Sequence, residues 1–232
     1  MGQHFLPGNP PVALLLRRSA RARRISLRVS GVDGRVTLTL PRGVAEGEAL
    51  KFAHEKAGWL RQQLGKRPAD MHVAAGAEIP LAGQAMRIAL APGDTRGVHA
   101  RGDTLLVPGP AGALPARLRA WLKQLARERL AQVSDRHAAA LGRSYTRLTL
   151  RDTRSRWGSC SAQGGLMYSW RLILAPEDVL DYVAAHEVAH LAEMNHSPAF
   201  WATVARLKPG YDAPRRWLRE NGAGLHRYRF GD

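Results

Sequence analysis

An HExxH motif at residues 186–190 is the part of the sequence whose residue types and spacing most directly indicate chemistry. Positions i and i+4 lie about 40° apart around an α-helix, so His186 and His190 can face one ion. Neutral imidazole is a good zinc ligand, and two such ligands leave coordination positions free. Glu187 would lie beside the ion and accept a proton from metal-activated water, whose pKa zinc lowers to about 7. The motif predicts a zinc-dependent hydrolase with Glu187 as general base.

A third ligand is expected downstream of the motif. His196 follows His186 at the spacing where extended zinc-protease motifs place another histidine. Those motifs carry Gly where this chain has Glu193, but Asn195 tolerates the left-handed conformation and could reverse the chain instead. Glu193 is the rival ligand, although an unbroken helix would carry it about 10 Å along the axis from His186. We predict zinc ligation by His186, His190 and His196.

The motif needs a helix before it and a turn after it. Pro176 followed by two acidic residues predicts a helix start, since acids in a first turn complement the positive end of the helix dipole. Ser197 and Pro198 are typical of an N-cap and the first position of another helix. The chain should therefore turn at about 194–197, which would return His196 toward the metal.

Hydrophobic periodicity predicts the remaining elements. Alternating apolar residues at 25–29 and 36–40, separated by turn residues, indicate a β-hairpin, and residues 44–63 have helical spacing. Further elements are expected as strands at 86–90 and 104–107, a long amphipathic helix ending near Gly142, and strands around 148–150 and 166–174. The Pro/Gly-rich segment 108–112 is the predicted domain boundary, giving a β-rich N-terminal region 1–112 and a second domain 113–232.

The composition is that of a strongly basic globular protein. The 232 residues include 35 basic and 19 acidic side chains, a net charge of +16. The densest basic cluster comprises Arg17, Arg18, Arg21, Arg23, Arg24 and Arg28. Such a surface would attract polyanions, so association with nucleic acid or nucleotides is possible, although a basic surface serving only solubility is the plain alternative. No recognised nucleic-acid-binding motif accompanies it.

The lengths of the apolar runs and the cysteine content restrict the kinds of protein that the sequence can encode. No apolar run approaches the roughly 20 residues that span a bilayer, so no membrane association and a cytoplasmic location are expected. Cys160 is the single cysteine, which excludes an internal disulfide and a thiolate-based zinc cage. A small buried thiol is the plain interpretation of Cys160, and a nucleophile the alternative.

Several polar residues near the motif have open roles. Arg151, Arg154 and Arg156, with Asp152 among them, form either a turn held by Arg–Asp pairing or a basic lip for an anionic substrate. Side chains that could stabilise an oxyanion are Tyr168, Tyr211, Tyr228 and His226. The sequence does not place any of these four in the cleft.

The segment 151–160 (RDTRSRWGSC), the motif at 186–190 and the segment 195–201 (NHSPAFW) together resemble the YgjP-like metallopeptidase family. The family is similar to the SprT-like and WLM metallopeptidases, and the strong match covers about 147–222. The resemblance implies an α+β fold with a zincin-like helical core and a small antiparallel sheet. An edge strand of that sheet would pair with an extended substrate, and on this interpretation residues 166–174 lie near the cleft. The resemblance also implies the same zinc ligands and Glu187 as base.

Three functions from different classes fit these observations. The first is a zinc-dependent metallopeptidase acting on a protein or peptide by metal-activated water. The alternative is a zinc-dependent hydrolase of phosphorylated or nucleotide substrates, which would use the same chemistry with Arg side chains holding phosphate. A non-enzymatic nucleic-acid-binding module with structural zinc is disfavoured, because a closed site needs a fourth ligand in place of a base.

Overall fold

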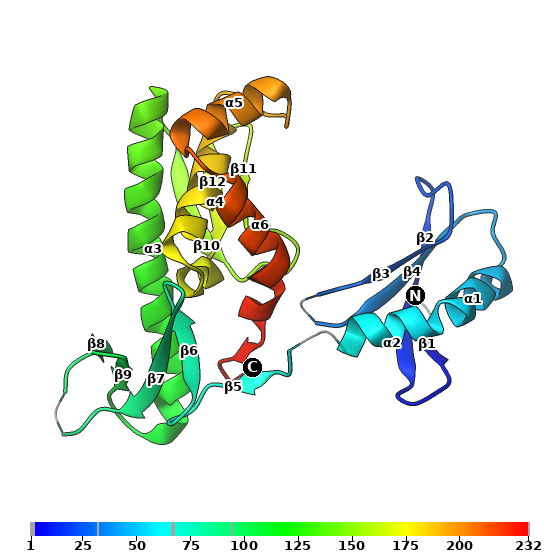
Figure 1. The fold of residues 1–232 in the computed structure, drawn as a ribbon, viewed down its shortest axis with the longest axis horizontal. Helices are drawn as coiled ribbons and strands as arrows, with labels where there is room; N and C mark the ends of the chain where they lie inside the picture. Colours follow the sequence, from blue (N-terminus) through cyan, green and yellow to red (C-terminus); the bar gives the residue numbers. More distant parts are fainter. Residues whose placement is uncertain (1–2, 32, 66–67, 94, 232) are drawn as a thin grey trace. The chain divides into compact units, whose positions relative to one another are not determined.

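The computed structural model describes residues 3–31, 33–65, 68–93 and 95–231. The chain forms two compact units, Met1–Ala69 and Asp70–Asp232 (Figure 1). Both units mix helices with small sheets, so the predicted α+β class is confirmed. None of the helices in the described part of the chain is long and apolar enough to cross a lipid bilayer.

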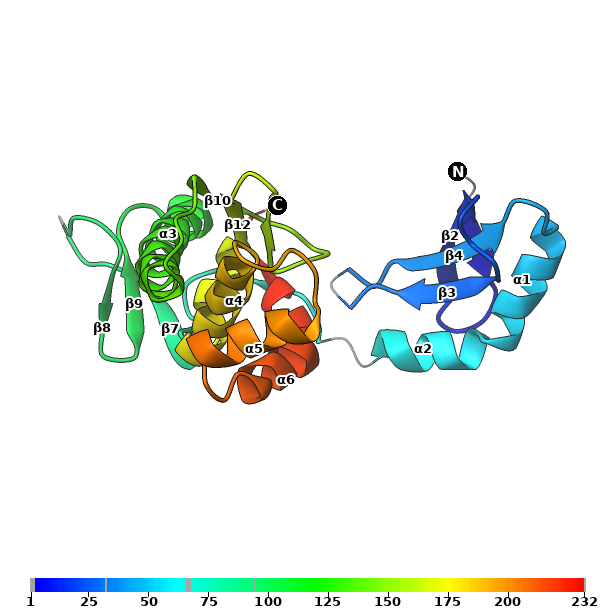
Figure 2. The same ribbon diagram turned by 90° about the horizontal axis from the view of Figure 1, so that it is seen from above.

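The first unit is a four-stranded sheet with two helices on one face. The strands, in the spatial order β1-β2-β4-β3, are β1 (Gln3–Leu6), β2 (Val12–Ser19), β4 (Val36–Pro41) and β3 (Ser26–Val29). The predicted hairpin is confirmed as β3 paired antiparallel with β4, whereas β2 pairs with β4 in parallel. Alternate residues of β2 and β4 are buried, and they form one core with the two helices (Figure 2).

The helix predicted over 44–63 is two helices, α1 (Glu46–Glu55) and α2 (Ala57–Gly65). The break falls at Lys56, whose ψ of 6° leaves the α-helical range. Ala49, Ala53 and Leu60 are the buried residues of the pair. The break turns the second helix so that both bury an apolar face against the sheet.

The second unit begins with β5 (Met71–His72) and a four-stranded sheet. In the order β6-β7-β9-β8 its strands are β6 (Glu78–Leu81), β7 (Gln84–Leu90), β9 (Thr104–Val107) and β8 (His99–Arg101). The strands predicted at 86–90 and 104–107 are present. Ile88, Leu105 and Val107 share one core with Leu114 and Leu118 of the following helix. The compact units therefore divide after Ala69, not after residue 112, because the Pro/Gly-rich segment is only a short connection within that core.

The rest of the second unit is helical around a small sheet. After η1 (Ala111–Ala113), the long helix α3 (Leu114–Leu141) ends at Gly142, whose φ of 68° gives the expected left-handed cap. The remaining elements are β10 (Arg147–Arg151), β11 (Gly158–Cys160), β12 (Gly165–Ser169), η2 (Trp170–Leu174), α4 (Glu177–Ala189), α5 (Pro198–Leu207), α6 (Asp212–Asn221), η3 (Gly222–His226) and β13 (Tyr228–Arg229). Helix α4 lies against α3, and β13 pairs with β5.

The small sheet differs from the expected one in two respects. Its order is β10-β12-β11, with β10 and β12 parallel and β11 and β12 antiparallel, so it is mixed. The strand predicted over 166–174 ends at Ser169 and is the central strand of the sheet. The residues that follow form the 3-10 helix η2, and all of them are buried.

A buried arginine ties the segment before β11 to the C-terminal end of the chain. Arg171 is only 4% exposed and donates to both carboxylate oxygens of Asp152, at 2.7 and 3.1 Å. It also donates to the backbone carbonyls of Leu225 and Tyr228, each at 3.1 Å. The turn at 151–156 is thus held by an Arg–Asp pair, but the arginine comes from η2 and not from the turn itself.

This pair makes the stability of the fold dependent on pH. Burial alone would raise the pKa of Asp152, but the hydrogen bonds and charge of Arg171 outweigh it and hold that pKa below its usual range. A carboxyl group with a lowered pKa contributes stability above its unfolded pKa of about 3.9, and this is lost as pH falls through the folded value. Asp152→Asn should lower the free energy of unfolding at pH 7 by roughly 1–3 kcal/mol, since Asp152 is partly exposed.

Urea denaturation followed by tryptophan fluorescence between pH 7 and pH 3 measures this effect. The difference between wild type and Asp152→Asn should shrink as pH falls below about 4. Asp103→Asn is the matched control, because Asp103 is exposed and only accepts a hydrogen bond from its neighbour Thr104. Equal stabilities for the two variants at pH 7 would contradict the proposed contribution of the buried pair.

Candidate metal centre

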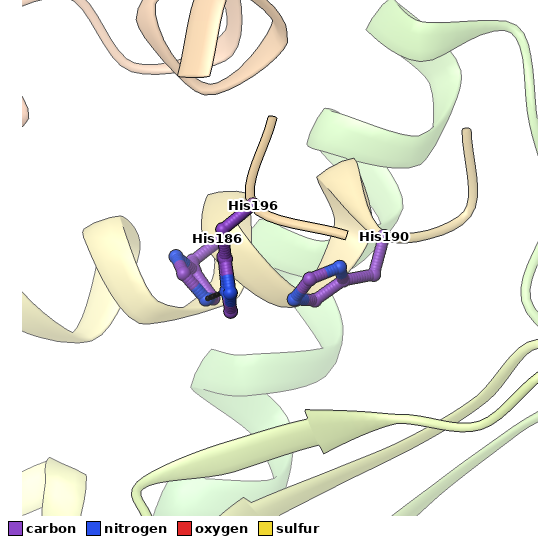
Figure 3. A group of neighbouring side chains, drawn as sticks. All are labelled: His186, His190 and His196. Carbon is purple, nitrogen blue, oxygen red and sulfur yellow. Dashed lines mark hydrogen bonds between the residues drawn. The ribbon is translucent and has the colours of Figure 1, made fainter. Parts of the chain in front are cut away.

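The three predicted ligands come together at the C-terminal end of α4 (Figure 3). His186 lies in the last turn of the helix, and His190 is its C-cap with helical backbone angles, so the i, i+4 relation is kept. The Nε2 atoms of His186 and His196 are 3.1 Å apart. The possible ligand atoms of all three histidines lie within 4.8 Å of one another. Among the described residues, no other group of three metal-binding side chains meets in this way.

Hydrogen bonding and burial define which nitrogens face the cluster. Nδ1 of His190 lies 2.9 Å from the carbonyl oxygen of Glu193, so Nδ1 is the donor and Nε2 keeps a free lone pair. Nδ1 of His186 is buried, with no hydrogen-bond partner among the described residues, while its Nε2 faces His196. His186 therefore directs its Nε2 toward His196, and the free lone pair of His190 is also on Nε2.

The turn that returns His196 differs from the expected one in its geometry. Asn195 is absent from the described residues with positive φ, so it does not reverse the chain by a left-handed conformation. Its side-chain oxygen instead accepts a hydrogen bond from the Ser197 amide at 3.1 Å, which forms an Asx turn. Ser197 then caps α5 by accepting from the Phe200 amide, with Pro198 at the first position, as predicted.

Glu193, the rival ligand, lies outside the cluster. Helix α4 ends at Ala189, so the unbroken helix that would have aligned Glu193 with His186 does not exist. Only its backbone carbonyl takes part, as the acceptor for His190. The geometry therefore favours His196 over Glu193 as the third ligand.

Aromatic side chains hold the three imidazoles in place. Phe200 is fully buried, and its ring centroid lies 4.9, 4.5 and 4.7 Å from those of His186, His190 and His196. Trp201 stacks on His196 at 5.8 Å, and the Arg215 guanidinium lies 4.3 Å above the Trp201 ring. Residues of α5 and α6 thus hold His196, the predicted ligand that lies outside α4. The role of Phe200 could not be predicted from local spacing, because its contact with all three imidazoles depends on how α5 packs against α4.

The environment of His186 and His190 favours their neutral form. Burial, together with the neighbouring His190 and His196, lowers the pKa of His186 to about 3. Burial also lowers the pKa of His190, although its hydrogen bond to Glu193 opposes the change. Neutral imidazoles are the form that binds a metal ion, so little proton competition is expected at these two residues near neutral pH.

Glu187 lies one residue from the first ligand and packs against β11. Its side chain is only 6% exposed, and burial raises its pKa to about 8 against the opposing charge of Arg156. A Cβ atom at Gly158 would lie 2.5 Å from Oε1 of Glu187, closer than real Cβ contacts allow. Residue 158 must therefore be glycine for the carboxyl group to occupy this position.

Strand β11 offers a free edge beside Glu187. Trp157 pairs with Ser169 and Ser161 with Gly165 through backbone hydrogen bonds of 2.8 and 2.9 Å. Because hydrogen-bonded pairs alternate in an antiparallel ladder, Gly158 and Cys160 direct their backbone N–H and C=O groups away from β12. No further strand of the described chain pairs with this side of β11.

A groove of about 680 Å³ opens at the other end of the ligand cluster. Its walls come from the end of α3, the turn between β11 and β12, and the segment after α4. The lining residues are Ala139, Gly142, Arg143, Ser144, Ser161, Ala162, Gln163, Gly164, His190, Leu191 and Met194. The groove contains His190 itself, so it communicates with the candidate metal centre.

The structure also gives the surroundings of the residues whose roles could not be predicted from the sequence. Burial raises the pKa of the Cys160 thiol, which favours the plain interpretation over a nucleophile. Tyr168 is buried against Ser134, and His226 is buried against Trp157. Of the four oxyanion candidates, Tyr211 stacks on Trp201, which itself contacts His196.

The arrangement fits a tetrahedral metal ion. With Zn–N bonds of about 2.0–2.1 Å, two nitrogens of a tetrahedral site lie about 3.3 Å apart. The His186 and His196 nitrogens already stand at nearly this separation. Three imidazoles, with no fourth protein ligand among the described residues, match an open metal site, and a buried glutamate beside them matches a proton acceptor.

These features define a metallopeptidase-type domain. The family model described as "YgjP-like, metallopeptidase domain" matches residues 23–221. The chain belongs to the YgjP-like metallopeptidase family, as the segments around 151–160, 186–190 and 195–201 predicted. Membership makes the protein a hydrolase of peptide bonds and implies a metal ion and a protein substrate.

Among solved structures, the chain is similar to the metallopeptidase zymogen abylysin of Pyrococcus abyssi. The two share 20% sequence identity over 39% of this chain and 93% of that one, with a TM-score of 0.36. No curated protein matches the chain.

The choice between His196 and Glu193 can be tested by metal affinity. His196→Ala should weaken zinc binding by more than about 100-fold, because even the loss of a residue that only supports a ligand costs about 10–100-fold. Glu193→Gln should leave the affinity unchanged, because only the backbone carbonyl of residue 193 takes part. Competition with a chromophoric chelator gives both values.

His54→Ala, which removes an exposed histidine of α1, is the control for this comparison. Zinc affinity lost in Glu193→Gln and kept in His196→Ala would reverse the assignment.

Proposed function

We propose that the protein is a zinc-dependent metallopeptidase in which His186, His190 and His196 hold the ion and Glu187 is the general base. The observation that carries the proposal is the meeting of three imidazoles with a buried carboxyl group at the free edge of a strand. Membership of a metallopeptidase family supports the reaction class, and the donor set supports zinc.

Zinc bound to three imidazoles supplies a Lewis acid that polarises a carbonyl group and lowers the pKa of water. Glu187 accepts the proton of the attacking water and later delivers it to the departing amine. Burial raises the pKa of Glu187 to about 8, and the positive charge of a bound ion would favour the carboxylate form that a base requires. Gly158 keeps this carboxyl group in position.

The substrate that fits this site is an extended polypeptide. Gly158 and Cys160 present backbone donors and acceptors to a strand added at β11, which binds main chain irrespective of side-chain identity. The groove beside His190 takes side chains on one side of the scissile bond. Arg143 is the one charged residue among its lining side chains, so acidic or polar side chains are favoured there.

Glu187→Gln tests the proposed mechanism. The amide keeps the shape of the side chain but cannot accept a proton, so cleavage of an unfolded protein by the zinc-loaded enzyme should fall by about 10²–10⁴-fold. Zinc stoichiometry should stay near one, because Glu187 is not a ligand. Mass spectrometry of the cleavage products and metal analysis of the purified protein measure the two quantities.

A parallel assay with nucleoside triphosphates and phosphopeptides tests the alternative hydrolase. Arg143 and Arg156, near the cluster, are the side chains that would then hold phosphate. Phosphate release without peptide cleavage would overturn the peptidase proposal. Peptide cleavage retained in Glu187→Gln would instead overturn the role of the base while leaving the peptidase assignment intact.

Gly158→Ala tests the contact that positions the base. The added methyl group would overlap Glu187, so kcat for peptide cleavage should fall by about 10-fold or more while zinc affinity remains near that of wild type. Gly224→Ala is the matched control, because a Cβ there meets no atom within 4 Å. Equal activity of the two variants would show that residue 158 does not constrain the base.

A further inference from the structure

The face of the first unit's sheet that points away from α1 and α2 has a distinctive set of side chains. Leu14, Leu16, Val36 and Leu38 are buried under the helices, so the intervening residues of β2 and β4 lie on the opposite, open face. Strand register then fixes which residues are neighbours there. Arg17, Thr39 and Ser26 form one row across the sheet, and Leu15, Thr37 and Arg28 form the next.

An aromatic ring completes this face. Phe5 pairs with Ala13 in the register of β1 and β2, so it lies on the same side as Leu15 and Arg17. Its side chain is 63% exposed, the largest value among the exposed large hydrophobic residues of the described chain. An aromatic ring held in a strand and left open to water costs solvation free energy, and this cost is removed when a planar partner stacks on it.

Positive charge extends from this face around one end of the sheet. Arg17 and Arg28 are exposed on it, and Arg21, Arg23 and Arg24 are exposed in the connection between β2 and β3. The acidic residues of this unit lie elsewhere. Three of them, Glu46, Glu48 and Glu55, belong to α1 on the covered side, and Asp33 pairs with Arg35 in the β3–β4 turn. Arg18 is not part of the surface, because it donates to the carbonyls of Arg42 and Val44.

We infer that this open sheet face, formed by Phe5, Leu15, Arg17, Arg28, Thr37 and Thr39, binds single-stranded nucleic acid. The face combines a ring on which a base can stack with guanidinium groups that neutralise phosphates and hydroxyl groups that donate to them. With strands about 4.8 Å apart and residues spaced at about 3.3 Å, Phe5 and the two arginines lie within about 15 Å of one another. This span suits a few nucleotides of extended strand.

A single strand fits this face better than other polyanions do. An open sheet offers no projecting helix for the major groove of a duplex, whereas bases of a single strand are free to stack on an exposed ring. A polyanion without bases would pair with the arginines but would have no ring to stack on Phe5. The surface belongs to the first compact unit and the candidate metal centre to the second, and both β1 and β2 precede the segment matched by the family model.

Fluorescence anisotropy of a labelled 12-nucleotide single strand, titrated with the full-length protein, tests the inference. Phe5→Ala should weaken binding by about 5- to 100-fold, the range expected for one base–aromatic stack. The double variant Arg17→Gln/Arg28→Gln should also weaken it and flatten the plot of log affinity against log salt by about 1.4, since each phosphate contact on a single strand contributes about 0.7.

The matched control is Lys51→Gln/Lys56→Gln, which removes the same charge from exposed positions in and just after α1. It should leave both affinity and slope near wild type. Phe5 is exposed, so Phe5→Ala should fold, and a thermal melt checks this; Phe5→Tyr, which keeps the ring, should retain binding.

Three outcomes would overturn the inference. These are equal losses in the test and control double variants, full binding by Phe5→Ala, and competition by heparin as effective as competition by an unlabelled single strand. Self-association of the free protein that Phe5→Ala abolishes would instead assign the face to a second copy of the chain. Peptide cleavage by Phe5→Ala should match wild type, so failure here leaves the proposed peptidase function untouched.

Discussion

The close contact between helix α4 and strand β11 is the constraint on which the catalytic region depends. Residue 158 can carry no side chain there, because the Glu187 carboxyl group occupies the space that a Cβ would need. The contact brings the buried carboxyl group to the edge of the sheet, next to backbone groups that no other described strand uses. The ion pair between Arg171 and Asp152 stabilises this contact, because it fixes the turn that leads into β11.

The candidate metal centre combines residues from a buried and an exposed part of the chain. Two histidines belong to the buried end of α4, whereas His196 lies in an exposed turn and depends on packing against Phe200 and Trp201. The cluster therefore needs α5 to be docked before the third imidazole is in place. Burial lowers the pKa of His186 and His190, and it raises the pKa of Glu187. One apolar environment would thus favour both neutral imidazoles for a metal ion and a carboxyl group able to hold a proton.

Local patterns in the sequence were sufficient for the helices and caps near the site. The i, i+4 spacing of His186 and His190, the Ser197 cap and the Gly142 cap all follow from short-range geometry. Long-range pairing could not be predicted in the same way. The parallel partnership of β10 with β12 joins segments on either side of β11, and Arg171 finds Asp152 through the tertiary fold.

Register explains why the open sheet face of the first unit escaped the sequence analysis. Phe5 and Arg28 lie on strands at opposite edges of that sheet, and no short motif relates them. The domain boundary was misplaced for a related reason, because a Pro/Gly-rich segment marks a turn equally well within a core and between two units.

X-ray absorption at the zinc edge of the zinc-loaded protein reports on the proposed ligand set itself. One tightly bound zinc with three imidazole nitrogens at about 2.0–2.1 Å and one oxygen ligand is expected. His196→Ala should reduce the imidazole count to two. A spectrum that shows two imidazoles and a carboxylate in the wild-type protein, or a zinc ion without histidine ligands, would contradict it.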